Sequence, residues 1–351
     1  MAVAERVGER VERLRASLDE PLLVTSGVNV RYLTGFQSSN AVLLVDEERV
    51  VLFTDFRYAE AARALEGVEF VESQRAVLKT VGETLRGRVG FEASALTYDG
   101  WQALQDAGLE LVPRRGLVER LRAIKDEDEL AAIREAARIT DEAYAAFAEE
   151  RSVGRTERDL AWRLEQILHE RGAHALSFEP IVGSGPTGAV PHGRPTDRVV
   201  GPNTTVVVDA GAVFRGYCAD CTRTFATGDL PDDLAEAYDV CLKGQLAGLE
   251  AMRAGVSGSE ADEAARRVIA DAGLGERFGH GLGHGVGLLV HEAPTARDDS
   301  EDVLEPGNVI TCEPGIYLEG RGGVRIEDLV VITDGEPEVL STYTKELVTV
   351  R

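Results

Sequence analysis

Two aspartates lie in segments whose apolar neighbours are typical of β-strands. Asp209 ends a run of three valines in TTVVVDAG, and Asp220 follows in GYCADCT. If a hairpin turns at 213–216 with its centre between Phe214 and Arg215, the two carboxylates face each other with Cβ atoms roughly 4.5–5.5 Å apart. A buried strand carboxylate is costly unless a positive charge compensates it. We therefore expect a cationic group between Asp209 and Asp220.

Two glutamates repeat this arrangement in VITCEPGIYLEGRGGVRIEDLVVIT, residues 309–333. The predicted turn lies near Gly320–Gly323. Glu313 and Glu327 are equidistant from Gly320, so a symmetric hairpin brings them together as well. Four inward carboxylates on two hairpins are therefore predicted.

The spacing of these acids indicates an internal repeat. Corresponding acids of the two hairpins are about a hundred residues apart, and helical patterns at 153–173 and 256–273 recur at a similar offset. In this alignment Glu157 matches Glu260 and Asp159 matches Asp262. The second part of the chain is thus expected to contain two related halves.

Four clustered carboxylates carry four negative charges, which two divalent cations would neutralise. Pairs of cations about 3.5–4 Å apart are common in hydrolytic sites. Oxygen-rich ligation with at most one imidazole favours manganese or a similar first-row ion, with cobalt or zinc as substitutes. A calcium loop is the competing interpretation. It is disfavoured because the acids lie on strands and not in one DxDxDG segment.

Three of the six histidines lie in FGHGLGHGVGLLVHE, residues 278–292, where glycine fills every second position from Gly279 to Gly287. This period of two predicts an extended segment with one face of bare glycine, which lets a backbone or a ligand approach closely. In that geometry His280 and His284 are about 13 Å apart and cannot bind the same ion. The opposite face would carry His280, Leu282, His284, Val286 and Leu288.

Each histidine also has a structural interpretation, as a buried hydrogen-bonded side chain. This alternative is weakest for His284 and stronger for His280 and His291. His192, in the Pro/Gly-rich AVPHGRP, is a separate candidate. His169 and His174 are typical of structural residues at helix ends.

The composition narrows the functional classes. The formal net charge of −23 argues against nucleic acid and anionic membranes as partners. No apolar run approaches the roughly 20 residues that span a bilayer, and the charged start lacks an apolar signal-peptide core. We therefore expect a cytoplasmic protein. The four cysteines, Cys218, Cys221, Cys241 and Cys312, are expected to be reduced and structural.

The length of 351 residues favours two domains. Up to about residue 120, short apolar runs alternate with helical patterns, such as those near 57–66 and 74–86, which predicts an α/β domain. No glycine-rich phosphate loop follows these runs. The charged helical segment 121–150 then begins, so the predicted domains are 1–122 and 123–351. The predicted strands are the runs PLLVTSG, AVLLVD, RVVLFTD, VEFVE, VGFEA and LELVP.

Taken together, these motifs resemble those of the Xaa-Pro peptidases with the pita-bread fold, namely prolidases and aminopeptidase P. The resemblance covers nearly all of the chain. It includes VNVRYLTGFQSSNAVLLV, FTDFRYAEAA, RAIKDEDELAAIREAA, DAGAVFRGYCADCTRTF, HGLGHGVGLLVHE, TCEPGIY and VRIED. It implies an α/β (α+β) protein, with an N-terminal creatinase-like α/β domain and a C-terminal pita-bread domain with a pseudo-twofold repeat.

The resemblance also implies roles for individual residues. His192 and His291 would contact the substrate and stabilise the transition state, and His280 would lie near the S1′ side. Tyr317 and Arg325 would bind substrate beside the ligands, and Glu313 would also handle the proton. The five implied metal ligands are Asp209, Asp220, His284, Glu313 and Glu327.

The implied activity is hydrolysis of Xaa-Pro dipeptides with two divalent cations per chain, most simply Mn²⁺, in a homodimer. Aminopeptidase P, acting on longer Xaa-Pro peptides, is the close alternative, and a metal-free binding protein of this fold is the alternative from another class. One position departs from the pattern. Many prolidases read HExPR, but here HEAPT places Thr295 at the basic position. A substrate carboxylate would then need another arginine. The candidates are Arg297, Arg31, Arg49 and Arg57, from this chain or from a partner subunit.

Overall fold

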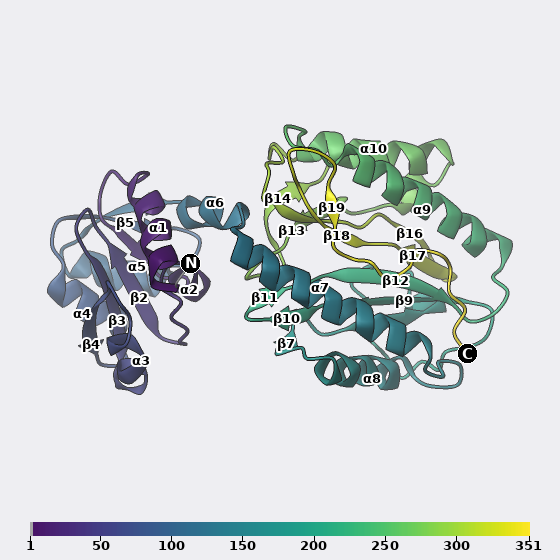
Figure 1. Ribbon diagram of the computed structural model, residues 1–351, viewed down its shortest axis with the longest axis horizontal. Helices are drawn as coiled ribbons and strands as arrows, with labels where there is room; N and C mark the ends of the chain where they lie inside the picture. The colour runs from purple at the N-terminus through teal and green to yellow at the C-terminus, as the bar shows by residue number, and fades with distance from the viewer. Residues whose placement is uncertain (1–2) are drawn as a thin grey trace. The chain divides into compact units, whose positions relative to one another are not determined.

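The computed structural model describes residues 3–351, which form two compact units divided between Arg122 and Ala123. Each unit has its own layers of helices and strands (Figure 1). Within the described residues, none of the helices combines the length and the apolar character needed to cross a membrane.

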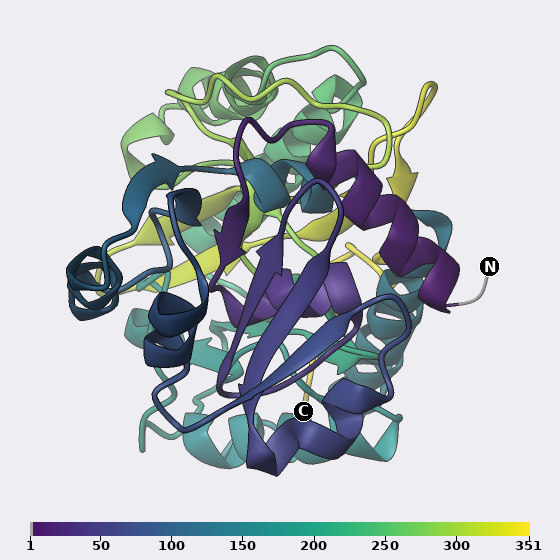
Figure 2. The ribbon, with the colours of Figure 1, turned by 90° about the vertical axis from the view of Figure 1, so that its left-hand side faces the viewer.

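The N-terminal unit is built on a six-stranded sheet with the order β4-β3-β2-β1-β5-β6 (Figure 2). All six predicted strands are confirmed. They are β1 (Leu22–Val24), β2 (Ala41–Val45), β3 (Val50–Asp55), β4 (Glu69–Ser73), β5 (Arg88–Glu92) and β6 (Glu110–Arg114). Alternate strand residues such as Leu23, Val42 and Phe53 pack with Val81 and Leu104 of two covering helices. This alternation is the two-residue period of a strand.

The helices of this unit include α3 and α4, which match the predicted patterns near 57–66 and 74–86, and α2 and α5, which also lie between predicted strands. The bounds are α1 (Val3–Arg15), α2 (Gly27–Thr34), α3 (Ala59–Arg63), α4 (Val77–Thr84), α5 (Tyr98–Asp106) and α6 (Leu117–Ala123).

The second unit contains two halves of similar construction, each a helix pair followed by strands. In the first half α7 (Glu127–Ala148) and α8 (Glu157–Glu170) precede the strands. In the second half α9 (Asp232–Ala251) and α10 (Gly258–Asp271) do. Figure 1 shows α8 and α10 on opposite sides of the strands of this unit. The pseudo-twofold repeat is therefore visible in the order of elements.

The strands of this unit form four sheets, ordered β11-β10-β7, β12-β9-β8, β14-β13-β15-β18-β19 and β16-β17. The first half supplies β7 (Ala175–Leu176), β8 (Ile181–Ser184), β9 (Thr205–Ala210), β10 (Ala212–Phe214), β11 (Tyr217–Cys218) and β12 (Cys221–Ala226). The second half supplies β13 (Gly283–Gly285), β14 (Glu292–Ala296), β15 (Val309–Cys312), β16 (Gly315–Leu318), β17 (Gly322–Arg325), β18 (Asp328–Val331) and β19 (Glu338–Val339).

Helix capping corrects the predicted alignment of the two halves. Thr156 caps α8 by accepting from the backbone N–H of Asp159, and Ser257 caps α10 by accepting from that of Glu260. Equivalent caps satisfy the exposed N–H groups of equivalent first turns. Asp159 therefore corresponds to Glu260 and not to Asp262, so the predicted match was wrong by two residues.

The four cysteines are buried thiols, in agreement with the predicted structural role. The thiols of Cys241 and Cys312 donate to the backbone oxygens of Pro314 and Gln245. Burial raises the pKa of the Cys241 thiol to about 12, which disfavours the reactive thiolate.

A buried ion pair joins the two halves. Arg223 of β12 donates from Nη2 to Oδ1 of Asp328 in β18 at 2.9 Å, and their side chains are 2% and 0% exposed. The other carboxylate oxygen of Asp328 accepts from Gln245 and Lys345. Because every charge in this cluster has partners, the pair can remain in the core.

Replacing Asp328 with alanine is expected to lower the free energy of unfolding by about 3–5 kcal/mol, because it leaves the Arg223 guanidinium buried without its counter-charge. Chemical denaturation of the purified protein measures this change. Asp334→Ala, which removes an exposed acid of the following turn, is the matched control and should be nearly neutral. Equal stability of the two variants would contradict the prediction.

Candidate active site

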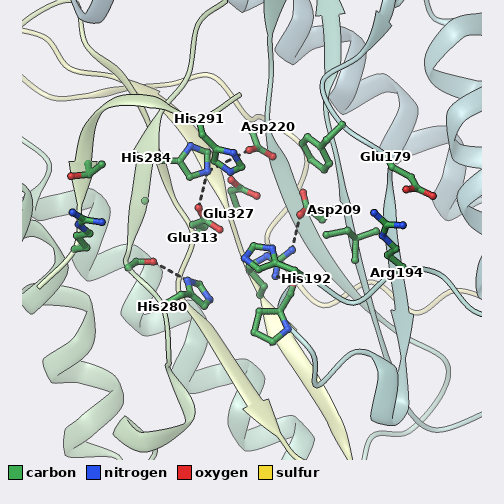
Figure 3. A pocket seen from close by; sticks show the side chains of 18 of the residues that line it. Glu179, His192, Arg194, Asp209, Asp220, His280, His284, His291, Glu313 and Glu327 are labelled. Carbon is green, nitrogen blue, oxygen red and sulfur yellow. Dashed lines mark hydrogen bonds and ion pairs between the residues drawn. The ribbon is translucent and has the colours of Figure 1, made fainter. Parts of the chain in front are cut away.

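One cavity of about 470 Å³ collects most of the predicted site residues. Figure 3 shows the carboxylates of Asp220, Glu313 and Glu327 beside His284. The cavity draws on both halves of the second unit. Of the predicted residues, those that line it are His192, Asp209, Asp220, His280, His284, His291, Glu313, Arg325 and Glu327.

The first hairpin brings Asp209 and Asp220 to the same cavity, but not in the predicted register. Asp209 lies opposite Thr222 in the β9–β12 ladder, so its partner is two residues beyond the predicted Asp220. The turn is formed by Arg215 and Gly216, both with positive φ. Residues that are diagonal across a ladder still share a face, so both aspartates remain on the cavity side.

The second hairpin has the predicted symmetry. On one side of the two glutamates Cys312 pairs with Asp328, and on the other side Gly315 pairs with Arg325. Both pairings are centred on Gly320, which has a φ of 71°. The common register places Glu313 opposite Glu327, where the two ladders are interrupted.

Arg325 supplies a buried positive charge beside Asp209. Its Nη2 donates to Oδ2 of Asp209 at 2.7 Å, its Nε donates to the Thr222 hydroxyl, and its side chain is 3% exposed. The Thr222 hydroxyl in turn donates to Oε2 of Glu327 at 2.7 Å. The guanidinium therefore contacts Asp209 and lies one hydroxyl away from Glu327. Arg325 pairs with Asp209 alone, so a cationic group between Asp209 and Asp220 stays a prediction.

His284 is the imidazole closest to the carboxylates. Its Nδ1 donates to the backbone oxygen of Gly285, which leaves Nε2 free to face Oε1 of Glu313 at 3.1 Å and Oδ2 of Asp220 at 3.7 Å. The Thr311 hydroxyl donates to Glu313 and accepts from the backbone N–H of His284. Residues of β13 and β15 thus hold this pair together.

The electrostatics of the cluster are those of a buried, acid-rich site. Burial raises the pKa of Asp220 and of Glu327 well above the usual carboxyl range, and neighbouring carboxylates add to the effect. Burial also acts to raise the pKa of Glu313, but the hydrogen bond and charge of His284 outweigh it and lower that pKa to about 2. A cation in this site would therefore relieve repulsion among the other carboxylates.

The donor atoms fit a divalent cation. One ligand atom each from Asp220, His284 and Glu327 lie within 4.8 Å of one another. Oδ1 of Asp209 and Oε1 of Glu327 are buried without a hydrogen-bond partner. Buried acceptors are normally satisfied, so these two carboxylates each retain an oxygen that suits a metal ion.

The other histidines lie beside this cluster. The His291 ring packs against the His284 ring with a centroid distance of 4.2 Å. His280 donates from Nδ1 to the Gly281 oxygen and accepts at Nε2 from the Tyr317 hydroxyl at 2.9 Å. Burial lowers the pKa of His280, which favours this neutral form.

Tyr317 connects His280 to the buried arginine. Its hydroxyl accepts from Nη1 of Arg325 at 3.1 Å. Tyr317 is absent from the residues that line the cavity, unlike the predicted substrate contacts His192 and His280. Seen from the cavity, Tyr317 therefore lies behind His280.

The glycine-rich segment is only partly extended. Strand β13 spans three residues, and the register shifts between His284 and Gly285. Leu282 and Val286 are buried in two different cores, so the prediction of one face shared with the histidines was wrong. The shift lets the chain turn different faces inward along this segment.

The glycines permit close approach of neighbouring backbone. A Cβ at Gly283 would lie 1.9 Å from the Thr311 backbone oxygen, and one at Gly285 would lie 2.2 Å from that of Ala293. The prediction that the bare positions admit another backbone is therefore confirmed. Strand β13 lies between β14 and β15 at a separation that a side chain would prevent.

Several cavity residues were not predicted from the sequence. Phe178, Glu179, Ile181 and Arg194 form part of the wall, and Figure 3 shows Glu179 and Arg194 on the side away from His284. The one available signal was their proximity in sequence to His192. Arg297 and Thr295 also line the cavity.

Comparison with known proteins gives two family matches and several full-length relatives. Residues 131–334 match metallopeptidase family M24, and residues 10–124 match the creatinase/prolidase N-terminal domain. The chain is 34% identical to the Xaa-Pro dipeptidase of Pyrococcus furiosus, over 97% of this chain and 99% of that protein.

Two solved structures are similar over the whole chain. The Xaa-Pro dipeptidase from Bacillus anthracis superposes with a TM-score of 0.95 at 38% identity, covering 98% of this chain and 100% of that one. The X-Pro aminopeptidase from Thermotoga maritima superposes with a TM-score of 0.88 at 32% identity, covering 97% and 100%.

Proposed function

Because the chain belongs to metallopeptidase family M24 and carries a creatinase/prolidase N-terminal domain, we propose that it hydrolyses the Xaa-Pro bond of dipeptides. The observation that carries this proposal is the cluster of four carboxylates and His284 at the wall of one cavity. The full-length Xaa-Pro dipeptidases among its relatives support the same substrate class.

Two divalent cations are proposed to bind at this cluster, most simply manganese, with cobalt or zinc as substitutes. The proposed ligands are Asp209, Asp220, His284, Glu313 and Glu327. The unpartnered buried oxygens of Asp209 and Glu327 support this ligand set. When bound, such cations lower the pKa of a coordinated water and polarise a carbonyl oxygen.

The side chains around the cluster have distinct tasks in this proposal. His192 and His291 face the cavity and are exposed, so they are placed to bind the substrate and oppose charge that develops on the scissile carbonyl oxygen. Glu313, whose Oε1 faces Nε2 of His284, is placed to receive a proton at a carboxylate oxygen. His280, fixed by Tyr317, borders the proline side. The tertiary amide before proline has no N–H to donate to the site. The site must therefore recognise the proline by its shape.

A dipeptide also presents a terminal carboxylate, which the cavity must receive. The Thr295 hydroxyl contacts Ser300 and Asp302. Arg194 and Arg297 both line the cavity with exposed side chains, and Arg297 pairs only at the surface with Asp299. These two arginines are our proposed carboxylate receptors.

Within the N-terminal unit, Arg49 and Arg57 contact Asp46 and Asp55. These contacts make them weaker candidates for the carboxylate than the two cavity arginines. Arg31, and an arginine supplied by a partner subunit, remain predictions for the carboxylate receptor.

The decisive test compares an Xaa-Pro dipeptide with the matching Xaa-Pro-Xaa tripeptide under manganese. We expect the dipeptide to have the higher kcat/KM. Arg297→Ala and Arg194→Ala are expected to lower it roughly 10–100-fold for the dipeptide, chiefly through KM, because a charge-assisted hydrogen bond is worth about 1.5–3 kcal/mol. Arg277→Ala, an exposed change outside the cavity lining, is the control.

Preference for the tripeptide would favour the second candidate function, an aminopeptidase acting on longer Xaa-Pro peptides. We retain this candidate because the chain is similar to the Thermotoga maritima X-Pro aminopeptidase. Unchanged kinetics in both arginine variants would remove the carboxylate assignment without affecting the dipeptidase proposal.

A cytoplasmic homodimer is the proposed form of the enzyme. The resemblance to Xaa-Pro peptidases supports the dimer. Sedimentation equilibrium at micromolar concentration should give twice the chain mass of 37.9 kDa. A single-chain mass would contradict the dimer.

A further inference from the structure

Glu157, the first residue of α8, is fully buried and accepts five hydrogen bonds. Its Oε1 accepts from the backbone N–H of Ser184 at 2.8 Å, from the Ser184 hydroxyl at 2.8 Å and from the Thr187 hydroxyl at 2.6 Å. Its Oε2 accepts from the backbone N–H of Thr196 at 3.1 Å and from the Thr196 hydroxyl at 2.7 Å. One carboxylate therefore binds two separate stretches of backbone.

These two stretches are the ends of the segment that carries His192. Ser184 ends β8, and after the short 3₁₀ turn Gly185–Thr187 the chain up to Thr196 has no helix or strand. Within this segment His192 and Arg194 line the cavity. The backbone hydrogen bonds within this segment, all of which the structure describes, are four local ones between residues 185 and 193, so external contacts are needed to fix its position.

We propose that Glu157 is a positioning residue, whose carboxylate closes the loop 185–195 and thereby aims His192 at the reaction site. This inference rests on the proposed peptidase function for its catalytic consequence. A carboxylate suits the task because both of its oxygens only accept, and all five surrounding groups donate. Glutamine would turn an N–H₂ group towards one of the two sets of donors.

The other half of the unit contains a comparable arrangement. Asp262, in the first turns of α10, is 1% exposed and accepts from the backbone N–H of Leu282 at 2.9 Å. Its partner Arg266 donates to the backbone oxygens of Phe278 and His280. In each half, then, a buried acid of the second helix holds the backbone of a histidine-bearing segment.

The test uses Glu157→Gln, with Asp159→Asn as the matched control. Asp159 is an exposed acid of the same helical turn and lies outside the cavity lining. In the manganese-loaded enzyme, Glu157→Gln is expected to lower kcat/KM for an Xaa-Pro dipeptide roughly 10–100-fold, the range typical of residues that orient active-site groups. Metal content should stay equal to that of the wild type, and Asp159→Asn should keep full activity.

A double-mutant cycle separates positioning from general destabilisation. If Glu157 acts through His192, Glu157→Gln should have little further effect on kcat/KM in a His192→Ala background. An equal loss in both backgrounds, or full activity of Glu157→Gln, would overturn the proposal. If Glu157→Gln does not fold, Thr196→Val decides, because it removes one hydroxyl donor and should give a smaller loss with the same dependence on His192.

Hydrogen exchange distinguishes failure of this inference from failure of the proposed function. Glu157→Gln should speed amide exchange at Ser184, Thr196 and the loop between them, with or without peptidase activity. A wild-type enzyme that does not cleave Xaa-Pro peptides would refute the proposed function alone. Unchanged exchange in Glu157→Gln would refute the role of Glu157 in closing the loop.

Discussion

Replacing Asp209 with asparagine is expected to lower kcat/KM for an Xaa-Pro dipeptide by at least about 10³-fold, a loss of about 4 kcal/mol of transition-state stabilisation. Asp209 presents a buried, unpartnered oxygen to the cavity, and its charge is needed to hold a cation there. The amide keeps one oxygen that can accept from Arg325, so the fold should survive. Steady-state kinetics and metal analysis of the purified variant measure both consequences.

Asp229→Asn is the matched control, since this exposed aspartate follows the same hairpin and does not line the cavity. It should retain wild-type activity and metal content. A fully active Asp209→Asn enzyme would contradict the ligand assignment.

Removal of divalent cations by a chelator is expected to abolish hydrolysis and lower the melting temperature, and added manganese should restore both. The reason is that a ligand which binds only the native state stabilises it by about 4 kcal/mol when its free concentration is 1,000 times its Kd. Kinetics and differential scanning calorimetry of the same sample give the two readings.

The Asp209→Asn variant supplies the control for chelation, because its melting temperature should respond much less to manganese than that of the wild type. Full activity in the presence of the chelator would contradict a metallopeptidase mechanism. If the metal-free protein binds the peptide without hydrolysing it, the result would support the alternative of a metal-free binding protein.

The two hairpins show what the sequence can and cannot predict. The centre of the second hairpin was predictable because the glutamates and the ladder residues are symmetric about Gly320. The turn centre of the first hairpin was misplaced by one residue, which moves the partner of Asp209 by two, because the turn uses Arg215 with a φ of 49° followed by Gly216. Two positive φ values fit a two-residue hairpin turn, and an arginine gives little warning of the first.

The cavity wall illustrates a different limit. The six strands of the first unit follow local patterns, so they were predictable. Arg194 and Glu179 reach the cavity because of where the 185–195 loop and the chain before β8 lie in the tertiary structure. The contacts that set this loop, from Glu157 to Ser184 and Thr196, join residues 27 and 39 positions apart, which no local period encodes.

Arg325 gives the acid-rich site a counter-charge that comes from the chain itself. A site with four carboxylates and no cation would oppose its own burial, but the guanidinium already offsets part of this charge within the chain. The newly made polypeptide therefore has a counter-ion of its own before it meets a metal.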